Sequence, residues 1–522
     1  MKKTANKIFH FFQSRPKTDY IFVGLAIAVF FALAFWTITK YTIWFDEAFS
    51  AYIIKYNFIE IARYTATDVH PPLFYWVLKI WSSVFGQTDI GLRSMSVVFG
   101  AVAVLFGFLL VRRQFGRKAA LVSVFILVIS PLFVRYSQEA RMYTLATAIV
   151  LSATFVMLKA AETKSRKLWV LYGVLVSAGM WTHYFTILAW LAHWAWRYVT
   201  VRQGGERGKA LFRKFFSREW LTAYITAIVL FLPWLPAMAI QLVVVQSNGF
   251  WIGPVGVDTV GTYFGTLAYY LEHDHVTGYA SLALILMGIL TTVLALRIYR
   301  TENKATKRNY TLLLSLAAVP PVLLFVVSMP PLTSSFVERY VLPAAAASAL
   351  FMGVTLVYGM KGLRIWKQLL VYALVAAMLL YGLTNMYFYG NYNKNSRTDI
   401  LTKQLVQDAM AKSPAGTPII MSTPWTFYEA IFYATAEHPV YFIDADVDYG
   451  YGSLDMLKYS DAHKIKDLGA FAKEHPTVWY MGYSQGVLES PDANWKAIDS
   501  ITETSSIDGQ SYYKGIEYDT AQ

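Results

Sequence analysis

Two adjacent carboxylates, Asp46 and Glu47, stand in the run Trp44-Phe45-Asp46-Glu47-Ala48, directly after the first long apolar block. Carboxylates that aromatic neighbours partly desolvate at a bilayer surface have the chemistry of a general base. A simpler interpretation is that both acids stabilise the start of the next helix through its N-terminal dipole. The spacing alone leaves both interpretations open.

A second cluster, Asp68-Val69-His70-Pro71-Pro72, places an aspartate and a histidine two positions apart in a turn that the prolines fix. Such a pair can share a divalent cation or hold a phosphate. Two ligands do not make a metal site, because hard cations take six or more. The alternative is an ordinary turn before a helix, with a solvated Asp68.

Three cationic places could hold an anion near the membrane boundary: the segment from Arg135 to Arg141, His183, and Arg339 with the adjacent Tyr340. A guanidinium group forms bidentate, charge-assisted hydrogen bonds with a lipid phosphate. Each place also has a structural interpretation. Arg135 could pair with Glu139, Arg339 could pair with the preceding glutamate, and His183 could be an interior histidine.

Other residue clusters predict no site. We interpret His273-Asp274-His275 as a surface loop. The alternating acids from Asp444 to Asp448 resemble a calcium loop, but Tyr449 occupies the position where such a loop needs its turn glycine. The sequence has no Gly-rich phosphate loop, Gly-x-Ser-x-Gly elbow or His-Glu-x-x-His pair, and no cysteine for thiolate chemistry.

The composition indicates the class of fold that carries these candidate residues. Of 522 residues, 56% are hydrophobic and 15% charged, which excludes an ordinary soluble enzyme, and 16% aromatic residues exclude disorder. The apolar residues form blocks of about 20, the length of a membrane span. We predict an α-helical polytopic membrane protein with about eleven spans, at 21–39, 92–111, 119–134, 143–160, 168–182, 184–199, 220–243, 279–298, 310–329, 340–360 and 368–388.

The charges orient the predicted bundle. Residues 1–390 hold 36 basic and 15 acidic residues, whereas residues 391–522 hold 10 and 18. With a cytoplasmic N-terminus, 28 of the 36 basic residues fall on the inner side, as the positive-inside rule requires. The basic residues punctuate span ends and form no nucleic-acid face. We predict a multi-pass protein of a bacterial plasma membrane, with the C-terminal region outside.

Two domains are predicted. Residues 1–390 form the membrane domain, with an outer loop at 40–91 that carries the candidate acids and an interfacial helix at 73–81. Residues 391–522 form a small α/β domain with a partly parallel sheet. Its predicted strands are 418–422, 439–443 and 477–481, and its predicted helices are 426–435 and 464–473.

The order of these motifs resembles glycosyltransferase family 39, which has a GT-C fold and includes protein mannosyltransferases and lipid A aminoarabinose transferases. The resemblance covers most of residues 20–390. The motifs that carry it are Trp44-Phe-Asp46-Glu47, Asp68-x-His70-Pro-Pro, Gly91-Leu-Arg93, Ser137-Gln-Glu139-Ala-Arg141-Met-Tyr143, Thr182-His183-Tyr184 and Glu338-Arg339-Tyr340-Val-Leu-Pro343.

The resemblance implies an inverting hexosyl- or pentosyltransferase that takes its sugar from a polyprenyl phosphate in the outer leaflet. Asp46 would be the base, supported by Glu47. The donor phosphate would contact four residues, His70, Arg141, Arg339 and Tyr340. Asp68 and Glu47 would be ligands of any divalent cation, although the turn at Asp68 is offset by one residue from that of the aminoarabinose transferases. His183 would contact substrate.

Two other functions fit the same sequence. One is a transporter or flippase of lipid-linked sugars, but transporters place charges at mid-membrane, whereas here the acids gather at one face. The other is an inactive scaffold that binds lipid-linked glycans. For the transferase, the acceptor would be an envelope protein, lipid or polysaccharide, and the sequence names neither the acceptor nor the sugar.

Overall fold

The computed structural model describes residues 16–248, 252–270, 278–389, 401–444, 461–484, 487–504 and 513–521. The chain divides into two compact units. The first contains Met1–Trp36 and Arg93–Gly390, and the second contains Thr37–Leu92 and Asn391–Gln522. The predicted boundary at residue 390 also separates the units. The predicted outer loop at 40–91 lies in the same compact unit as the C-terminal region.

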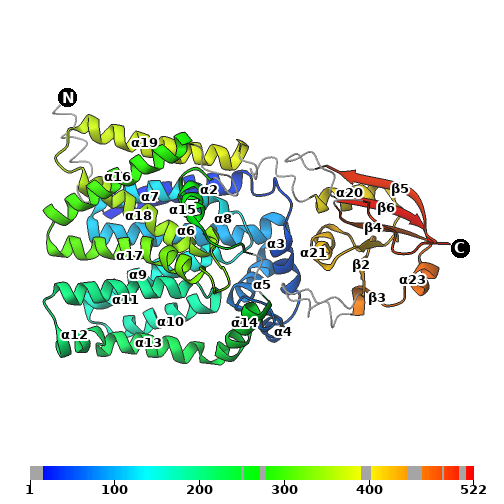
Figure 1. Ribbon diagram of the computed structural model, residues 1–522, viewed down its shortest axis with the longest axis horizontal. Helices are drawn as coiled ribbons and strands as arrows, with labels where there is room; N and C mark the ends of the chain where they lie inside the picture. The colour runs from blue at the N-terminus through cyan, green and yellow to red at the C-terminus, as the bar shows by residue number, and fades with distance from the viewer. Residues whose placement is uncertain are drawn as a thin grey trace. The chain divides into compact units, whose positions relative to one another are not determined.

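The first unit is helical, and Figure 1 shows many of its helices running side by side. Short η1 (Leu232–Trp234), η2 (Glu338–Val341) and η3 (Asn385–Tyr389) adjoin longer helices. The α-helices are α2 (Pro16–Trp36), α6 (Asp89–Phe115, which starts in the second unit), α7 (Arg117–Val128), α8 (Pro131–Ser137), α9 (Tyr143–Thr163), α10 (Arg166–Thr182), α11 (Thr186–Gln203), α12 (Gly208–Phe215), α13 (Arg218–Phe231), α14 (Leu235–Asn248), α15 (Val257–Tyr269), α16 (Gly278–Thr301), α17 (Lys304–Val327), α18 (Leu342–Gly359) and α19 (Ile365–Thr384).

Helices cover most of each predicted span, although 119–134 and 220–243 are each divided between successive helices, so the helical polytopic fold is confirmed. Within the described residues, eight helices are long and apolar enough to cross a membrane. The pair α7 and α8 adds a ninth if it is one span bent by 61°. The bend coincides with Pro131, which cannot donate a backbone hydrogen bond to continue α7. By length and apolarity, α10 and α11 do not qualify, since α10 has 17 residues and α11 includes His193 and Arg197.

Two of the glycines in this unit show how closely its helices pack. A Cβ atom on Gly353 of α18 would lie 2.4 Å from the Ser123 backbone of α7, where the Ser123 hydroxyl donates a 3.0 Å hydrogen bond to the Leu350 carbonyl. A Cβ atom on Gly173 of α10 would lie 2.2 Å from the Ala223 carbonyl oxygen of α13. Small residues at these crossings let helix backbones approach, as is typical of membrane bundles.

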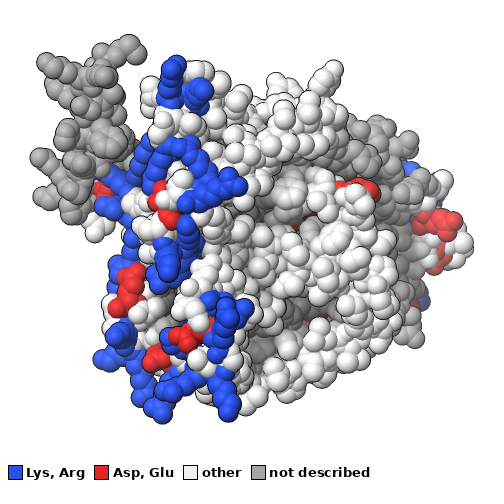
Figure 2. Space-filling model, turned by 60° about the vertical axis from the view of Figure 1, so that its left-hand side comes forward, with Lys and Arg blue, Asp and Glu red and all other residues white. Residues whose placement is uncertain are grey.

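Basic side chains gather at one end of the first unit (Figure 2). Several ion pairs join the helix ends there, including the following three. Arg112 contacts Asp19 at 2.9 Å, Arg113 contacts Glu162, and Lys361 contacts Glu302 at 2.6 Å. The segments predicted to face the cytoplasm therefore share one end of the bundle. Which side of a membrane that end faces stays a prediction.

The second unit combines three helices from the predicted outer loop with a six-stranded sheet. The loop helices are α3 (Phe45–Ile53), α4 (Phe58–Ala66) and α5 (Leu73–Phe85). The C-terminal region contributes α20 (Thr402–Lys412), α21 (Pro424–Tyr433), η4 (Asp461–His463) and α23 (Leu468–Glu474). Its strands are β1 (Ile419–Met421), β2 (Val440–Ile443), β3 (Lys464–Ile465), β4 (Thr477–Tyr483), β5 (Lys496–Glu503) and β6 (Tyr513–Asp519).

The sheet has the order β3-β2-β1-β4-β6-β5. Strands β3, β2, β1 and β4 are parallel, whereas β6 pairs antiparallel with both β4 and β5. The predicted partly parallel α/β domain is confirmed. The helix predicted at 464–473 is wrong at its start, because Lys464–Ile465 forms β3 and the helix begins at Leu468.

Aromatic rings join the two parts of this unit. Tyr428 of α21 is fully buried and lies edge-on to three rings of α3. Its ring centroid lies 5.9 Å from those of Phe45 and Phe49 and 5.2 Å from that of Tyr52. Helix α3, which carries the candidate acids, therefore packs on the C-terminal domain.

Candidate active site

Asp46 and Glu47 occupy the first turn of α3. The preceding Trp44 is extended, and its carbonyl accepts hydrogen bonds from the amides of Glu47 and Ala48, both at 2.9 Å, which starts the helix. Glu47 is fully buried and Asp46 is half-buried. The helix dipole stabilises negative charge at this end, so the capping interpretation accounts for where both acids lie. A catalytic role for Asp46 remains a proposal.

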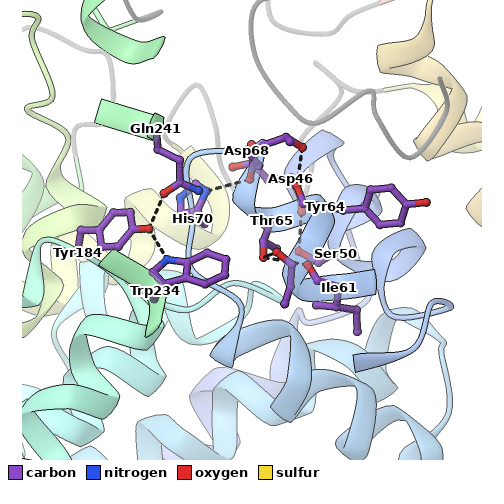
Figure 3. A network of polar contacts seen from close by, with 12 residues as sticks. Asp46, Ser50, Ile61, Tyr64, Thr65, Asp68, His70, Tyr184, Trp234 and Gln241 are labelled. Carbon is purple, nitrogen blue, oxygen red and sulfur yellow. Dashed lines mark hydrogen bonds and ion pairs between the residues drawn. The ribbon is translucent and has the colours of Figure 1, made fainter. Parts of the chain in front are cut away.

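Asp68 and His70 lie together in the turn between α4 and α5. Asp68 Oδ2 is 3.5 Å from His70 Nδ1, and both side chains are largely buried (Figure 3). Helix α4 is held by a capping box, in which Asn57 accepts hydrogen bonds from backbone amides and Glu60 accepts one from the amide of Asn57. Asp68 and His70 therefore lie together on a well-defined turn, and a role for them in holding a phosphate or a cation stays a prediction.

The donor set for a divalent cation is small. Among the described residues, no three His, Asp or Glu side chains form a group that could hold a metal ion, so Glu47 does not join Asp68 and His70 in one. A hard cation would need several further oxygen ligands. These residues alone do not fit a resident metal, and the candidates His273–His275 and Asp446–Asp448 lie outside the described residues.

The helix predicted at 73–81 is present as α5, residues Leu73–Phe85. The charge on Lys79 has a structural use, because its ammonium donates a 2.8 Å hydrogen bond to the Ile54 carbonyl just beyond α3. The indole of Trp76 similarly donates to the Phe58 carbonyl at the start of α4, at 2.9 Å. Helix α5 thus ties the three loop helices together. Its location at a membrane interface stays a prediction.

In the first unit, Arg135 and Glu139 form a buried ion pair at i, i+4 spacing, as the structural interpretation predicted. The Nε of Arg135 also donates a 2.7 Å hydrogen bond to the Tyr270 hydroxyl. Arg141 is buried too, with 2% exposure, and its carbonyl accepts a hydrogen bond from the Ser96 hydroxyl. The Arg135 guanidinium therefore has a structural role. Arg141 remains the candidate of this segment for the predicted donor-phosphate site.

His183, Tyr340 and Arg339 come together in the first unit. The Tyr340 ring stacks on Phe185 at 5.1 Å between centroids, and the His183 ring lies 5.1 Å from Tyr340. The Arg339 guanidinium lies 5.8 Å from the Tyr340 ring centroid, and Tyr143 lies 5.9 Å from His183. His183 is buried, as the interior-histidine interpretation expected. Two predicted site residues, His183 and Tyr340, thus share one aromatic cluster, and the third, Arg339, lies half-buried beside it.

Sequence reasoning missed Phe185 and Tyr143 as members of this cluster, because they join it only through tertiary packing. It also missed a polar chain in the same unit. The Trp234 indole donates a 2.7 Å hydrogen bond to the Tyr184 hydroxyl, which donates in turn to the Gln241 side-chain oxygen (Figure 3). Gln241 is buried within a candidate span, where a polar side chain needs such a partner.

The predicted site residues divide between the two units. Asp46, Glu47, Asp68 and His70 belong to the second unit, and Arg141, His183, Arg339 and Tyr340 belong to the first. The candidate residues of the two units differ in chemical type. The second unit supplies carboxylates and an imidazole, and the first supplies guanidinium groups and aromatic rings.

Comparison with known proteins bears on the fold of the chain. Residues 69–236 match the family model of dolichyl-phosphate-mannose-protein mannosyltransferases. The apo crystal structure of ArnT from Cupriavidus metallidurans matches over 96% of this chain and 97% of that one, with a TM-score of 0.63 and 13% identity. The chain has the GT-C glycosyltransferase fold.

This GT-C chain matches a second ArnT structure from the same organism, bound to undecaprenyl phosphate, over 97% of its length and 99% of that protein, with a TM-score of 0.61 and 13% identity. No curated protein matches the chain. His70, Arg141 and His183 fall inside the family match, and the predicted resemblance is confirmed at the level of the fold.

Proposed function

We propose that the protein is a membrane glycosyltransferase that moves a sugar from a polyprenyl-phosphate donor to an envelope acceptor, with inversion at the anomeric carbon. The observation that carries the proposal is the ArnT match over nearly the whole chain, including a structure that holds undecaprenyl phosphate. The aromatic and cationic cluster of Arg339, Tyr340 and His183 supports it as a place for a lipid phosphate.

Asp46 is the proposed base. Its carboxylate accepts the proton of the acceptor hydroxyl as the oxygen attacks the anomeric carbon, on the face opposite the phosphate. The bond from that carbon to the phosphate oxygen breaks, and the polyprenyl phosphate leaves with the electron pair. Glu47, buried beside Asp46, supports the base.

The leaving phosphate needs positive charge and no proton donor. Arg141 and Arg339 supply guanidinium groups for its oxygens, and His70 and Tyr340 add hydrogen bonds. Asp68 orients the His70 imidazole through their 3.5 Å contact. No step runs through a metal ion, because the described residues present no donor set of three. His183, whose ring packs on Tyr340, is a proposed substrate contact.

The test is the Asp46→Asn variant in detergent. We expect release of undecaprenyl phosphate from a panel of undecaprenyl-phosphate sugars to be lost in the presence of membrane extract as acceptor, while thermal stability is kept. The matched control is Asp258→Asn, which changes an exposed acid in the first turn of α15 and should retain activity. Full turnover by Asp46→Asn would contradict the assignment of the base.

Transport without bond cleavage is the competing function. A flippase would move labelled donor across a vesicle membrane and leave its sugar–phosphate bond intact. Mass spectrometry of envelope glycans with and without the protein would identify both the sugar and the acceptor.

The proposed location is the bacterial plasma membrane, with a cytoplasmic N-terminus and an external C-terminal domain. The chain has no cysteine, so Glu474→Cys at the exposed end of α23 introduces a single thiol. An impermeant maleimide should label it in intact cells whose outer membrane is permeable to the reagent. Labelling only after lysis would reverse the topology.

A further inference from the structure

A pocket of about 90 Å³ lies inside the second unit, between α3 and α21. Helix α3 and the turn after it contribute Ala48, Ala51, Tyr52 and Lys55, which share one helical face at i, i+3, i+4 and i+7 spacing. The two alanines leave the room that larger side chains would fill. The opposite wall comes from α21 at the same spacing, and the rim from Gln87 after α5. The residues of that wall are Tyr428, Ile431 and Phe432.

The pocket is apart from the proposed base. On a helix with about 100° of rotation per residue, Asp46 points roughly opposite to Ala48 and Ala51. A ligand in the pocket would therefore lie across the width of α3 from the Asp46 carboxylate. This excludes a role in the bond-breaking step and leaves a role in holding a ligand.

The pocket has a cation at its mouth. The Lys55 ammonium lies 4.9 Å from the centroid of the Tyr52 ring. Among the described residues, Lys55 forms no ion pair with a carboxylate. Although much of this side chain is open to solvent, burial of its ammonium lowers the pKa of Lys55. A desolvated ammonium with no carboxylate gains more from an incoming anion than a hydrated one does.

A second basic group lies near Lys55. The charge of Lys55 acts on His463 of η4, whose Nδ1 donates a 2.9 Å hydrogen bond to the Val440 carbonyl. The surroundings of Lys55 thus include an imidazole, aromatic rings and the Gln87 side-chain amide. Aromatic surface and an ammonium recognise an anionic sugar by stacking and charge, and the pocket has both without the Gln87 side chain on its rim.

We propose that this pocket binds an acidic sugar unit, one that carries a carboxylate or a phosphate group, of the glycan on which the enzyme acts. Its volume suits one charged substituent with part of a ring and not a whole oligosaccharide, since complete small-molecule sites are several times larger. The pocket would hold a polymeric acceptor at a distance from the reacting hydroxyl. The carbohydrate part of this proposal rests on the proposed function, whereas anion binding does not.

The experiment uses the absence of cysteine from the sequence. Gln87→Cys places one thiol on the pocket rim of the full-length protein, and its reaction with a maleimide in detergent is timed. Methyl β-D-glucuronide and glucose 1-phosphate, at millimolar concentrations, should each slow labelling at least threefold if both anions are accepted. The neutral methyl β-D-glucoside should not slow it.

Lys55→Met in the Gln87→Cys protein should abolish protection, whereas Lys209→Met, which removes an exposed lysine of α12, should leave it unchanged. Ala51→Leu should also abolish protection by filling the pocket. A thiol at Glu474→Cys, far along the sequence on α23, should never be protected.

The outcomes separate the two proposals, because the assay needs neither donor nor turnover. Protection that persists in Gln87→Cys/Asp46→Asn supports the pocket whatever the role of Asp46. Protection by only one of the two sugars identifies the anion. Equal protection by the neutral glucoside, protection that survives Lys55→Met, or no protection by either anionic sugar would overturn the proposal. Equal protection by inorganic phosphate would overturn its carbohydrate part.

Discussion

The backbone amide of Ile43 donates a 2.7 Å hydrogen bond to the hydroxyl of Tyr433, although 390 positions separate the two residues. Ile43 is fully buried and stands just before α3. The same tyrosine ring lies 5.2 Å from the Lys403 ammonium, and Lys403 contacts Asp89 at 3.5 Å. These contacts attach both ends of the predicted outer loop to the C-terminal domain. The C-terminal domain therefore contacts the chain directly before the helix that carries Asp46.

Removing the hydroxyl with Tyr433→Phe should destabilise the second unit. The buried Ile43 amide would lose its acceptor, and a buried donor left without one costs about 1–3 kcal/mol. We expect faster limited proteolysis of the 40–91 segment and a lower midpoint of denaturant unfolding. Tyr441→Phe, which keeps the ring contact with Phe471, is the matched control. Unchanged proteolysis would mean that the hydrogen bond does not hold the loop.

Local signals in the sequence predicted most of the helices. A span is encoded by about 20 consecutive apolar residues, which a sequence shows directly. Helix α4 was not predicted, although its Asn57–Glu60 capping box is a local start signal. The Arg135–Glu139 ion pair could also be predicted from a local signal, because i, i+4 spacing places both side chains on one face of a helix. The short strand Lys464–Ile465 could not, because two residues form a strand only by pairing with β2.

The candidate site was predictable in its residue types but not in its grouping. Phe185 and Tyr340 stack across 155 positions of sequence, which no periodicity encodes. Likewise, α3 was assigned to the membrane domain because its motif follows the first span. The rings that fix α3, above all Tyr428, come from a segment nearly 400 residues later. Hydropathy reports which segments are apolar and not which of them meet.

Arg339→Gln should weaken use of the lipid donor more than it slows turnover at saturation. The arginine lies beside the cluster of Tyr340 and His183, and hydrogen bonds to charged groups contribute about 1.5–3 kcal/mol. The apparent KM for an undecaprenyl-phosphate sugar should therefore rise roughly tenfold or more. Arg300→Gln, at the exposed end of α16, should leave it unchanged. An unaltered KM in Arg339→Gln would remove this residue from the phosphate site.

Glu139→Gln should destabilise the first unit strongly, because it leaves the buried Arg135 guanidinium without its carboxylate. Breaking one side of a buried ion pair costs about 3–5 kcal/mol, whereas replacing both partners by apolar residues is often neutral. We expect a large fall in the thermal unfolding temperature in detergent for Glu139→Gln, and substantial recovery in the double variant Arg135→Met/Glu139→Leu. A double variant no more stable than the single one would point to a further role for Arg135, such as its hydrogen bond to Tyr270.

His463 should make the C-terminal sheet sensitive to acid. Burial lowers the pKa of His463 below its usual 6.5; its hydrogen bond to the Val440 carbonyl opposes this shift, and the nearby Lys55 adds to it. The folded state therefore binds fewer protons at this site than the unfolded state does. The corresponding stability is complete above about pH 6.5 and is lost as the pH falls through the pKa of the folded state.

Hydrogen–deuterium exchange of β2, measured at pH 7 and pH 5 and corrected for the intrinsic rate, should show lower protection at pH 5. His463→Gln should reduce this loss, by at most about 1.4 kcal/mol of opening free energy per pH unit. Lys473→Gln, an exposed change on α23, should retain the full pH dependence. A wild-type slope in His463→Gln would assign the acid sensitivity to other groups. Because the imidazole is close to Lys55, an anion bound at Lys55 should also raise the pKa of His463 and so reduce the loss of protection in acid.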